Sequence, residues 1–294
     1  MKRIRVIVLF CLCFISDALP QSNFQLIEVL KQEQIPSQQG AALYGDYLFH
    51  FNINSECLIY NIKEKSFVTK IKGVYDKKGH CDTVCFGKKR YKWYDRFPLL
   101  YVSGSTTRMN DNCGKIWVYR VSHKKNVWSL TLVQIIETPN VRDVWAYPDA
   151  VFDDRGRMWM MGWDHRISFK NEAQRAKVVF NLFDCPRPKD GILKNGISYY
   201  SMKSDALIES FEIDNVHKVQ QGLCYHNSLI YVPYGSTVSG YQGIDIVDIS
   251  SRKVIANYNL MGTIVKEPEA VFIYKHDVYI ADQGTTIKML KTNR

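Results

Sequence analysis

Hydrophobic and polar residues alternate along most of this chain in short runs that end at turn-forming residues. One example starts with "LCYHN" and continues with "LIYVPYG", "YQGIDIVDIS" and, after the turn "SSRK", "VIANYNL". In the third run, Ile244 and Ile246 flank Asp245. Short runs rich in β-branched and aromatic residues, separated by turn residues, are typical of antiparallel strands. This stretch therefore predicts one four-stranded antiparallel sheet.

The same order of strands recurs five times along the chain. The copies start with "QQGAALYGDYLFHF", "HCDTVCFG", "YPDAVFDDRGRMWMMGW", "QQGLCYHNSLIYVPYG" and "EPEAVFIYKHDVYIAD", at Gln38, His80, Tyr147, Gln220 and Glu267. The copy at Tyr147 is the longest, with "KVVFNLF" and "LIESFEI" as its third and fourth strands and an excursion from Cys185 to Gly196 between them. Repeats of this kind indicate a propeller or a solenoid.

The last copy contains only three strands, and the segment "FQLIEVL" from Phe24 to Leu30 can supply a fourth. Pairing it there closes the ring and leaves no open sheet edge. We therefore predict an all-β fold, a five-bladed β-propeller closed by the N-terminal strand. Six blades are the alternative, if the copy at Tyr147 contains two short blades.

The first residues have the pattern of an export signal. Lys2, Arg3 and Arg5 precede an apolar run, and Ser16 and Ala18 are small residues where a signal peptidase cleaves. We predict a signal peptide over 1–18, a single propeller domain over 19–294, and a periplasmic, cell-surface or extracellular location. Cys11 and Cys13 could indicate a lipoprotein, but bulky residues precede both. No later stretch has the length of a membrane-spanning apolar helix.

The chain is basic, and cleavage after Ala18 would lower its formal charge from +10 to +8 by removing three basic residues and one acidic residue. Much of this charge lies between Lys63 and Lys92. Two interpretations of this basic segment stay open: solvated turns, or a patch that binds an anionic glycan or cell-wall polymer. No nucleic-acid-binding module is visible. Six cysteines remain after cleavage, an even number that permits disulfides in an exported protein but does not determine their pairing.

A polar residue stands just before each predicted innermost strand. These residues are Gln39, Asp82, Asp149, Gln221 and Glu269. Since innermost strands surround the channel of a propeller, we expect the five to converge on one mouth. Three carboxylates there could hold a cation such as Ca²⁺ or bind sugar hydroxyls. Alternatively, these polar groups satisfy the backbone or hold channel water.

Loops expected at the same mouth add aromatic, amide and cationic side chains. They contribute His50, Asn52, Arg108, Trp163, Asp164, His165, Arg166, Tyr234, Asp282 and Gln283, and His80, Tyr147 and Glu267 flank the ring. Aromatic rings beside planar hydrogen-bonding groups are typical of carbohydrate-binding surfaces. Paired carboxylates could also hydrolyse glycosidic bonds. The absence of "GxSxG", "HExxH", Walker and Rossmann motifs disfavours an enzyme.

A resemblance follows from "QG" at Gln39, "GHCD" at Gly79, "QG" at Gln221 and "EPE" at Glu267. In this ordered set the chain resembles the five-bladed propeller of bacterial phage receptor-binding and teichoic-acid-associated proteins, and exported bacterial propellers of unassigned function. It departs from them at Cys81 and Ala270. The resemblance implies binding of a cell-surface glycan or anionic polymer.

The expected function is thus a secreted binding module for a saccharide or anionic glycan at the channel mouth. The alternatives are a glycan-active hydrolase or lyase that uses the mouth carboxylates, and a protein-interaction scaffold.

Overall fold

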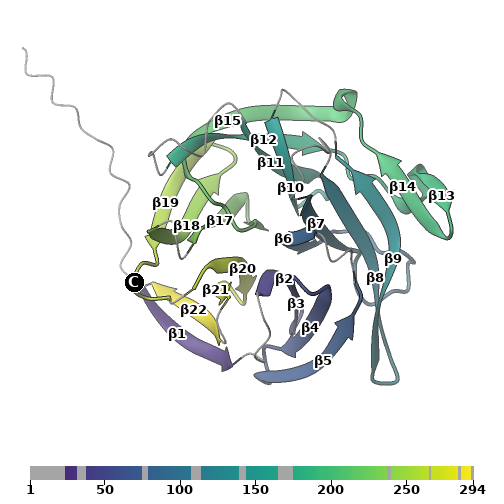
Figure 1. Ribbon diagram of the computed structural model, residues 1–294, viewed down its shortest axis with the longest axis horizontal. Coiled ribbons are helices and arrows are strands. Elements are labelled where there is room, and N and C mark those ends of the chain that lie inside the picture. The colour runs from purple at the N-terminus through teal and green to yellow at the C-terminus, as the bar shows by residue number, and fades with distance from the viewer. Residues whose placement is uncertain are drawn as a thin grey trace, which may run out of the picture.

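The computed structural model of the chain describes residues 24–31, 38–74, 79–106, 114–138, 144–164, 175–236, 240–264, 266–283 and 286–292. In this part of the chain the strands form five sheets arranged radially around a central channel (Figure 1). The five-bladed β-propeller predicted from the repeats is confirmed. The proposed signal peptide lies outside the described residues. No helix among the described residues is both long and apolar enough to cross a membrane.

Blade 1 is the simplest of the five and shows the common pattern. From the channel outward it consists of β2 (Gln38–Tyr44), β3 (Tyr47–Asn52), β4 (Glu56–Asn61) and β5 (Ser66–Lys72). Nearly every residue of β3 is buried, whereas most of β5 is exposed. Inner strands are covered on both faces by neighbouring blades, and this explains why they are continuous apolar runs rather than strict alternations.

Blades 3 and 4 repeat this order. Blade 3 consists of β10 (Val144–Phe152), β11 (Met158–Asp164), β12 (Arg175–Phe183) and β15 (Leu207–His217). Blade 4 consists of β16 (Cys224–His226), β17 (Leu229–Ser236), β18 (Tyr241–Asp248) and β19 (Lys253–Asn259). The third and fourth strands predicted for the longest copy are therefore confirmed as β12 and β15, and that copy forms one blade.

Blade 5 is completed by the N-terminal strand, as the sequence predicts. It consists of β20 (Pro268–Tyr274), β21 (Asp277–Asp282), β22 (Thr286–Thr292) and β1 (Phe24–Lys31). β1 pairs antiparallel with β22. Leu30 packs in a core shared with Leu48 of blade 1, and the Phe24 ring lies edge-on to Tyr258 of blade 4, with centroids 5.6 Å apart. This strand therefore joins the first and last blades and also contacts the fourth.

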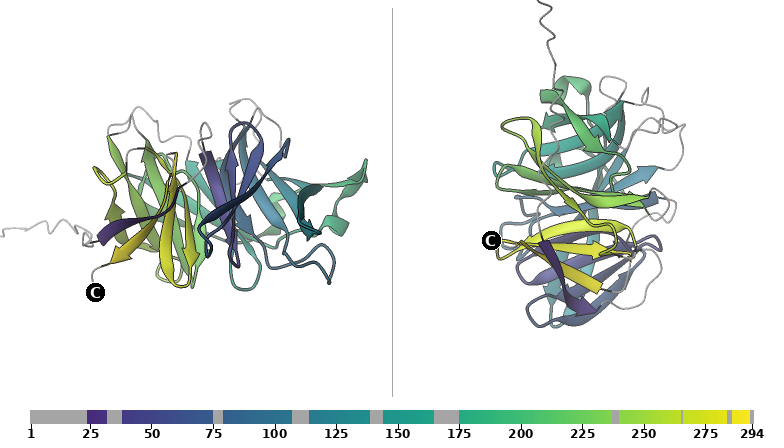
Figure 2. Two further views of the ribbon diagram at one scale, coloured as in Figure 1. Left: turned by 90° about the horizontal axis from the view of Figure 1, so that it is seen from below. Right: turned by 90° about the vertical axis from the view of Figure 1, so that its left-hand side faces the viewer.

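Blade 2 differs from the prediction because it acquires strands from another copy. Its own strands are β6 (Gly79–Phe86), β7 (Leu100–Thr106), β8 (Lys115–Lys124) and β9 (Val127–Glu137). The excursion between β12 and β15 contains η1 (Pro188–Asp190), β13 (Ile192–Lys194), β14 (Ile197–Ser201) and η2 (Ser204–Ala206). β14 pairs parallel with β9 and extends blade 2 to six strands, so the hairpin projects from the rim of the propeller (Figures 1 and 2).

The described cysteines are free thiols, although the even number of cysteines permits disulfides. They are Cys57, Cys81, Cys85, Cys185 and Cys224. Burial raises the pKa of each, to about 12 for Cys224, so these thiols stay protonated at neutral pH. Such cysteines pack as small apolar side chains. Cys113 lies outside the described residues.

Candidate functional site

The five polar residues lie within or just before the innermost strands, and not uniformly before them as the sequence predicted: Asp82 is in the middle of β6 and Asp149 is in the second half of β10. We call Gln39, Asp82, Asp149, Gln221 and Glu269 the polar ring. The pairing of the two inner strands shifts register between Gln38 and Ala41, between Cys81 and Val84, between Trp145 and Asp149, and between Pro268 and Ala270. A ring residue lies within or at the edge of each of these irregularities. β-Bulges bend a strand and redirect its side chains, and they are frequent beside functional sites.

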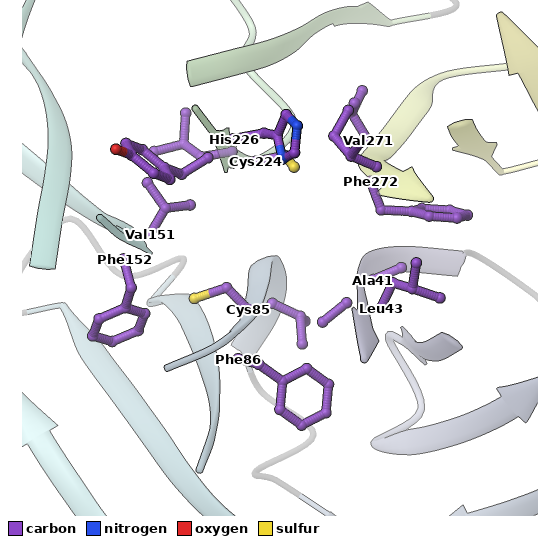
Figure 3. Close-up of a pocket in the computed structure, with 15 residues that line it drawn as sticks. Ala41, Leu43, Cys85, Phe86, Val151, Phe152, Cys224, His226, Val271 and Phe272 are labelled. Carbon is purple, nitrogen blue, oxygen red and sulfur yellow. The ribbon is translucent and has the colours of Figure 1, made fainter. Parts of the chain in front are cut away.

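Two residues beyond each ring position, a small or branched apolar side chain follows. These side chains belong to Ala41, Val84, Val151, Leu223 and Val271, and all five line a cavity of about 170 Å³ in the channel. Cys85, Cys224 and His226 line the same cavity (Figure 3). The polar ring therefore lies next to the apolar layer that lines the channel.

Asp82 occupies the crowded centre of this ring. A Cβ atom added to Gly40 would lie 2.6 Å from the Asp82 carbonyl oxygen, and one added to Gly222 would lie 2.7 Å from it. Gly222 also has a φ of +146°, a backbone conformation that favours glycine. The glycine of each "QG" pair therefore allows the backbones of blades 1 and 4 to approach that of blade 2.

The carboxyl groups of the ring interact electrostatically. Burial, followed by the charge of Asp82, raises the pKa of Asp149 to about 7. Burial also raises the pKa of Glu269 well above its ordinary value, and the charges of Glu267 and Asp82 add to this effect. Asp82 thus lies within electrostatic reach of both acids. The raised pKa values favour the protonated form of both acids, and a protonated carboxyl can donate as well as accept hydrogen bonds.

Neighbouring side chains hold these carboxyls in place. Thr83 Oγ1 donates a 2.6 Å hydrogen bond to Asp149 Oδ1. Gln283 Nε2 donates to Glu269 Oε1 and, at 2.8 Å, to Glu267 Oε2. The sequence places Gln283 at this mouth, but Thr83 was missed, because a threonine within a strand resembles any other β-branched residue.

The two amides of the ring bond to the backbone. Gln39 Nε2 donates to the carbonyl oxygen of Gln38 at 3.2 Å, and Gln221 Nε2 donates to that of Gly235 at 2.9 Å. His50 Nε2 lies 2.9 Å from the Gln39 carbonyl oxygen, and burial lowers the pKa of His50 to about 4, so a neutral ring donates there. His50 is therefore a buried residue of β3 that supports the ring, rather than the mouth-loop residue expected.

Tyr234 is also buried, at 2% exposure, although the sequence places it on a mouth loop. Its ring stacks on His217 with centroids 3.8 Å apart, and its hydroxyl accepts a 2.8 Å hydrogen bond from Asn257. Asp245 accepts from the backbone N–H of His217 at 2.7 Å and lies 2.9 Å from its Nδ1. Sequence reasoning missed this cluster of His217, Tyr234, Asp245 and Asn257. The cluster orders the segment that leads to Gln221.

The remaining candidates lie in or next to inner strands, or outside the described residues. His80 lies in β6, Tyr147 in β10 and Trp163 in β11, while Glu267 directly precedes β20. Arg166 lies outside the described residues, as do Arg108 and His165. Their roles in ligand binding stay predictions.

The donor set gives little support for a resident cation. Among the described residues, no three His, Cys, Asp or Glu side chains are grouped so that they could hold a metal ion. The described part of the ring is suited to hydrogen bonding and proton transfer.

Comparison with known proteins supports the fold and leaves the activity open. No family model matches the chain, and no curated protein matches its sequence. The resemblance to phage receptor-binding and teichoic-acid-associated propellers therefore stays a prediction. Among solved structures, the chain is similar to the glutaminyl cyclase of Myxococcus xanthus, with 8% identity, a TM-score of 0.54, and coverage of 94% of this chain and 100% of that one.

A second similar structure is a protein of Thermus thermophilus described as a putative oxidoreductase (glucose dehydrogenase). It is 9% identical, covers 91% of this chain and 100% of that one, and has a TM-score of 0.49. At such low identity, the likeness to the cyclase shows the fold alone.

Proposed function

We propose that this β-propeller is a saccharide-binding module that takes a sugar at the polar ring. The observation that carries the proposal is the cluster of Asp82, Asp149 and Glu269 in three innermost strands, with Asp82 within electrostatic reach of the other two. Enclosed sites with a few convergent polar groups beside apolar walls are typical of small-molecule binding.

The protonation of the cluster favours a neutral, hydroxyl-rich ligand. The raised pKa values of Asp149 and Glu269 favour their protonated forms, which offer donors as well as acceptors and reduce the negative charge of the ring. Sugar hydroxyls also act as both donors and acceptors. In this proposal His80, Tyr147, Trp163 and Arg166 complete the surface around the mouth, and residues 1–18 direct export.

A glycan array tests the proposal with a protein of residues 19–294, with and without Ca²⁺. We expect binding to neutral glycans that does not require Ca²⁺.

Asp149→Ala and Glu269→Ala should each weaken binding roughly tenfold to hundredfold, the loss expected for a buried hydrogen bond. Asp149→Asn and Glu269→Gln keep hydrogen-bonding groups and should lose less. Asp277→Ala, at an exposed turn of blade 5, serves as the control. Unchanged binding in both alanine variants would refute the proposal.

A glycan-active hydrolase or lyase is the second candidate, because the pKa of Asp149 rises to about 7 beside the charge of Asp82. A carboxyl poised near neutral pH beside a second carboxyl is typical of general acid–base pairs. The test is release of sugar ends from the glycans that bind. Loss of turnover in Glu269→Gln with retained affinity would establish the enzyme, whereas absence of turnover in the unaltered protein would exclude it for those glycans.

A further inference from the structure

A second concave surface lies on the rim of the propeller, separate from the polar ring. It is formed between the 87–99 connection of blade 2 and the 184–198 excursion from blade 3, and we call it the outer cleft. Its volume is about 930 Å³, large enough for a short oligosaccharide. The 87–99 connection follows Phe86, the last residue of β6, whereas Asp82 lies in the middle of that strand. The projecting β13–β14 hairpin marks the position of the outer cleft (Figures 1 and 2).

The lining of the outer cleft is strongly basic. Lys89 and Arg90 line it from the blade 2 connection, and Arg187 and Lys189 from the excursion; no carboxylate belongs to the lining. The nearby Asp190 pairs with Arg187 at 3.2 Å and offsets part of this charge. Cations on two facing segments create a positive potential between them, which suits an anionic group held in the middle.

An exposed aromatic side chain stands beside these cations. Trp93 is 90% exposed, and its ring packs edge-on against Tyr94, with centroids 5.5 Å apart and an interplanar angle of 84°. This contact leaves a flat apolar indole face available. Large exposed apolar side chains in a concave site indicate a binding surface, and the C–H face of a pyranose ring packs well against such a platform.

Ser198 of β14 forms part of the floor of the outer cleft, where this strand docks on β9. Its side chain is buried and packs closely against Gly191. The docked strand therefore supports the excursion that carries Arg187 and Lys189.

We propose that the outer cleft binds an acidic oligosaccharide, one that carries carboxylate or sulfate groups. The four cations bind the anionic groups, and Trp93 packs against a sugar ring. A nucleic-acid strand fits less well, since non-specific strand binding uses several stacked aromatic platforms along a basic groove. This proposal concerns a site other than the polar ring and does not depend on that site.

The test measures binding of three defined probes to residues 19–294 by calorimetry: oligogalacturonate, an uncharged maltooligosaccharide of equal length, and a single-stranded oligothymidylate. We expect oligogalacturonate to bind most tightly, with an affinity that falls as salt is added. Lys89→Gln combined with Lys189→Gln removes one exposed cation from each segment and should weaken this binding roughly tenfold or more. The matched control combines Lys253→Gln with Lys275→Gln, which removes the same charge from exposed turns of blades 4 and 5 and should leave binding unchanged.

The aromatic contribution is tested by Trp93→Ala, which should weaken binding, and by Trp93→Tyr, which should restore most of it. Asp149→Ala should leave the outer cleft unaffected, so failure at the polar ring and failure here are distinguishable. Equal binding of the charged and uncharged sugars would overturn the proposal. So would equal losses in the two double variants, tighter binding of the oligothymidylate, or no binding of oligogalacturonate.

Discussion

Thr83 Oγ1 donates a 2.6 Å hydrogen bond to Asp149 Oδ1, and this bond links the innermost strands of blades 2 and 3. Both residues are buried. The bond therefore fixes the position of a carboxyl group whose burial cost would otherwise be uncompensated. It also opposes the effects of burial and of Asp82 on the Asp149 pKa.

Replacing Thr83 by valine should raise the pKa of Asp149 above its value of about 7, because the hydroxyl that favours the ionised carboxyl is lost. The same change should lower the free energy of unfolding by about 1–3 kcal/mol, since it leaves a buried acceptor with one partner fewer. Carboxyl titration by NMR and urea denaturation measure the two effects. Thr83→Ser keeps the hydroxyl and should preserve both values; an unchanged pKa in the valine variant would contradict the assignment.

Stability should fall as the pH rises from about 4 to about 7. The Asp149 pKa in the folded protein lies above its ordinary value of 3.8, so the folded state holds this proton more tightly than the unfolded state does. That contribution is fully present below pH 3.8 and is lost as the pH approaches about 7. Melting temperatures across this range should decline less steeply for Asp149→Asn. A parallel decline in both proteins would show that Asp149 is not the titrating group.

Alanine at Gly40 or Gly222 should destabilise the propeller by about 1–3 kcal/mol, the usual cost of overpacking. In each case the added Cβ would come closer than 3 Å to the Asp82 carbonyl oxygen. Gly45→Ala is a suitable control, because a Cβ there meets nothing within 4 Å and only the positive φ of +59° opposes it. Chemical denaturation measures the free energy of unfolding of the three variants. A larger loss of this free energy for Gly45→Ala than for Gly40→Ala would argue against close packing around the Asp82 carbonyl oxygen.

Removing residues 19–31 should destabilise the whole domain. The deletion takes away β1, which pairs with β22 and contributes Leu30 to the core between blades 5 and 1. It would also expose the edge of β22 to pairing with other chains. Differential scanning calorimetry should show a lower melting temperature than in a protein that lacks only residues 19–23. Equal melting temperatures would mean that closure by β1 contributes little to stability.

The amino-acid sequence by itself determined the blades, most of their strands and the closure by β1. These features depend on neighbours along the chain: alternating side chains, turn residues, and a repeat that lacks one strand at the C-terminus. The sequence also identified one polar residue in or near each innermost strand, because equivalent positions in a repeat occupy similar places in a ring, although it placed the starts of β6 and β10 too late in the chain.

Tertiary structure alone decided what surrounds those residues. The bulges beside the ring, the bond from Thr83 to Asp149 and the raised pKa of Glu269 all depend on segments distant in sequence. The same holds for the burial of Tyr234 against His217 and for the docking of β14 on β9. Burial and charge proximity arise only when blades pack together, so no local pattern in the chain encodes them. The outer cleft follows from the same cause, since its walls come from different copies of the repeat.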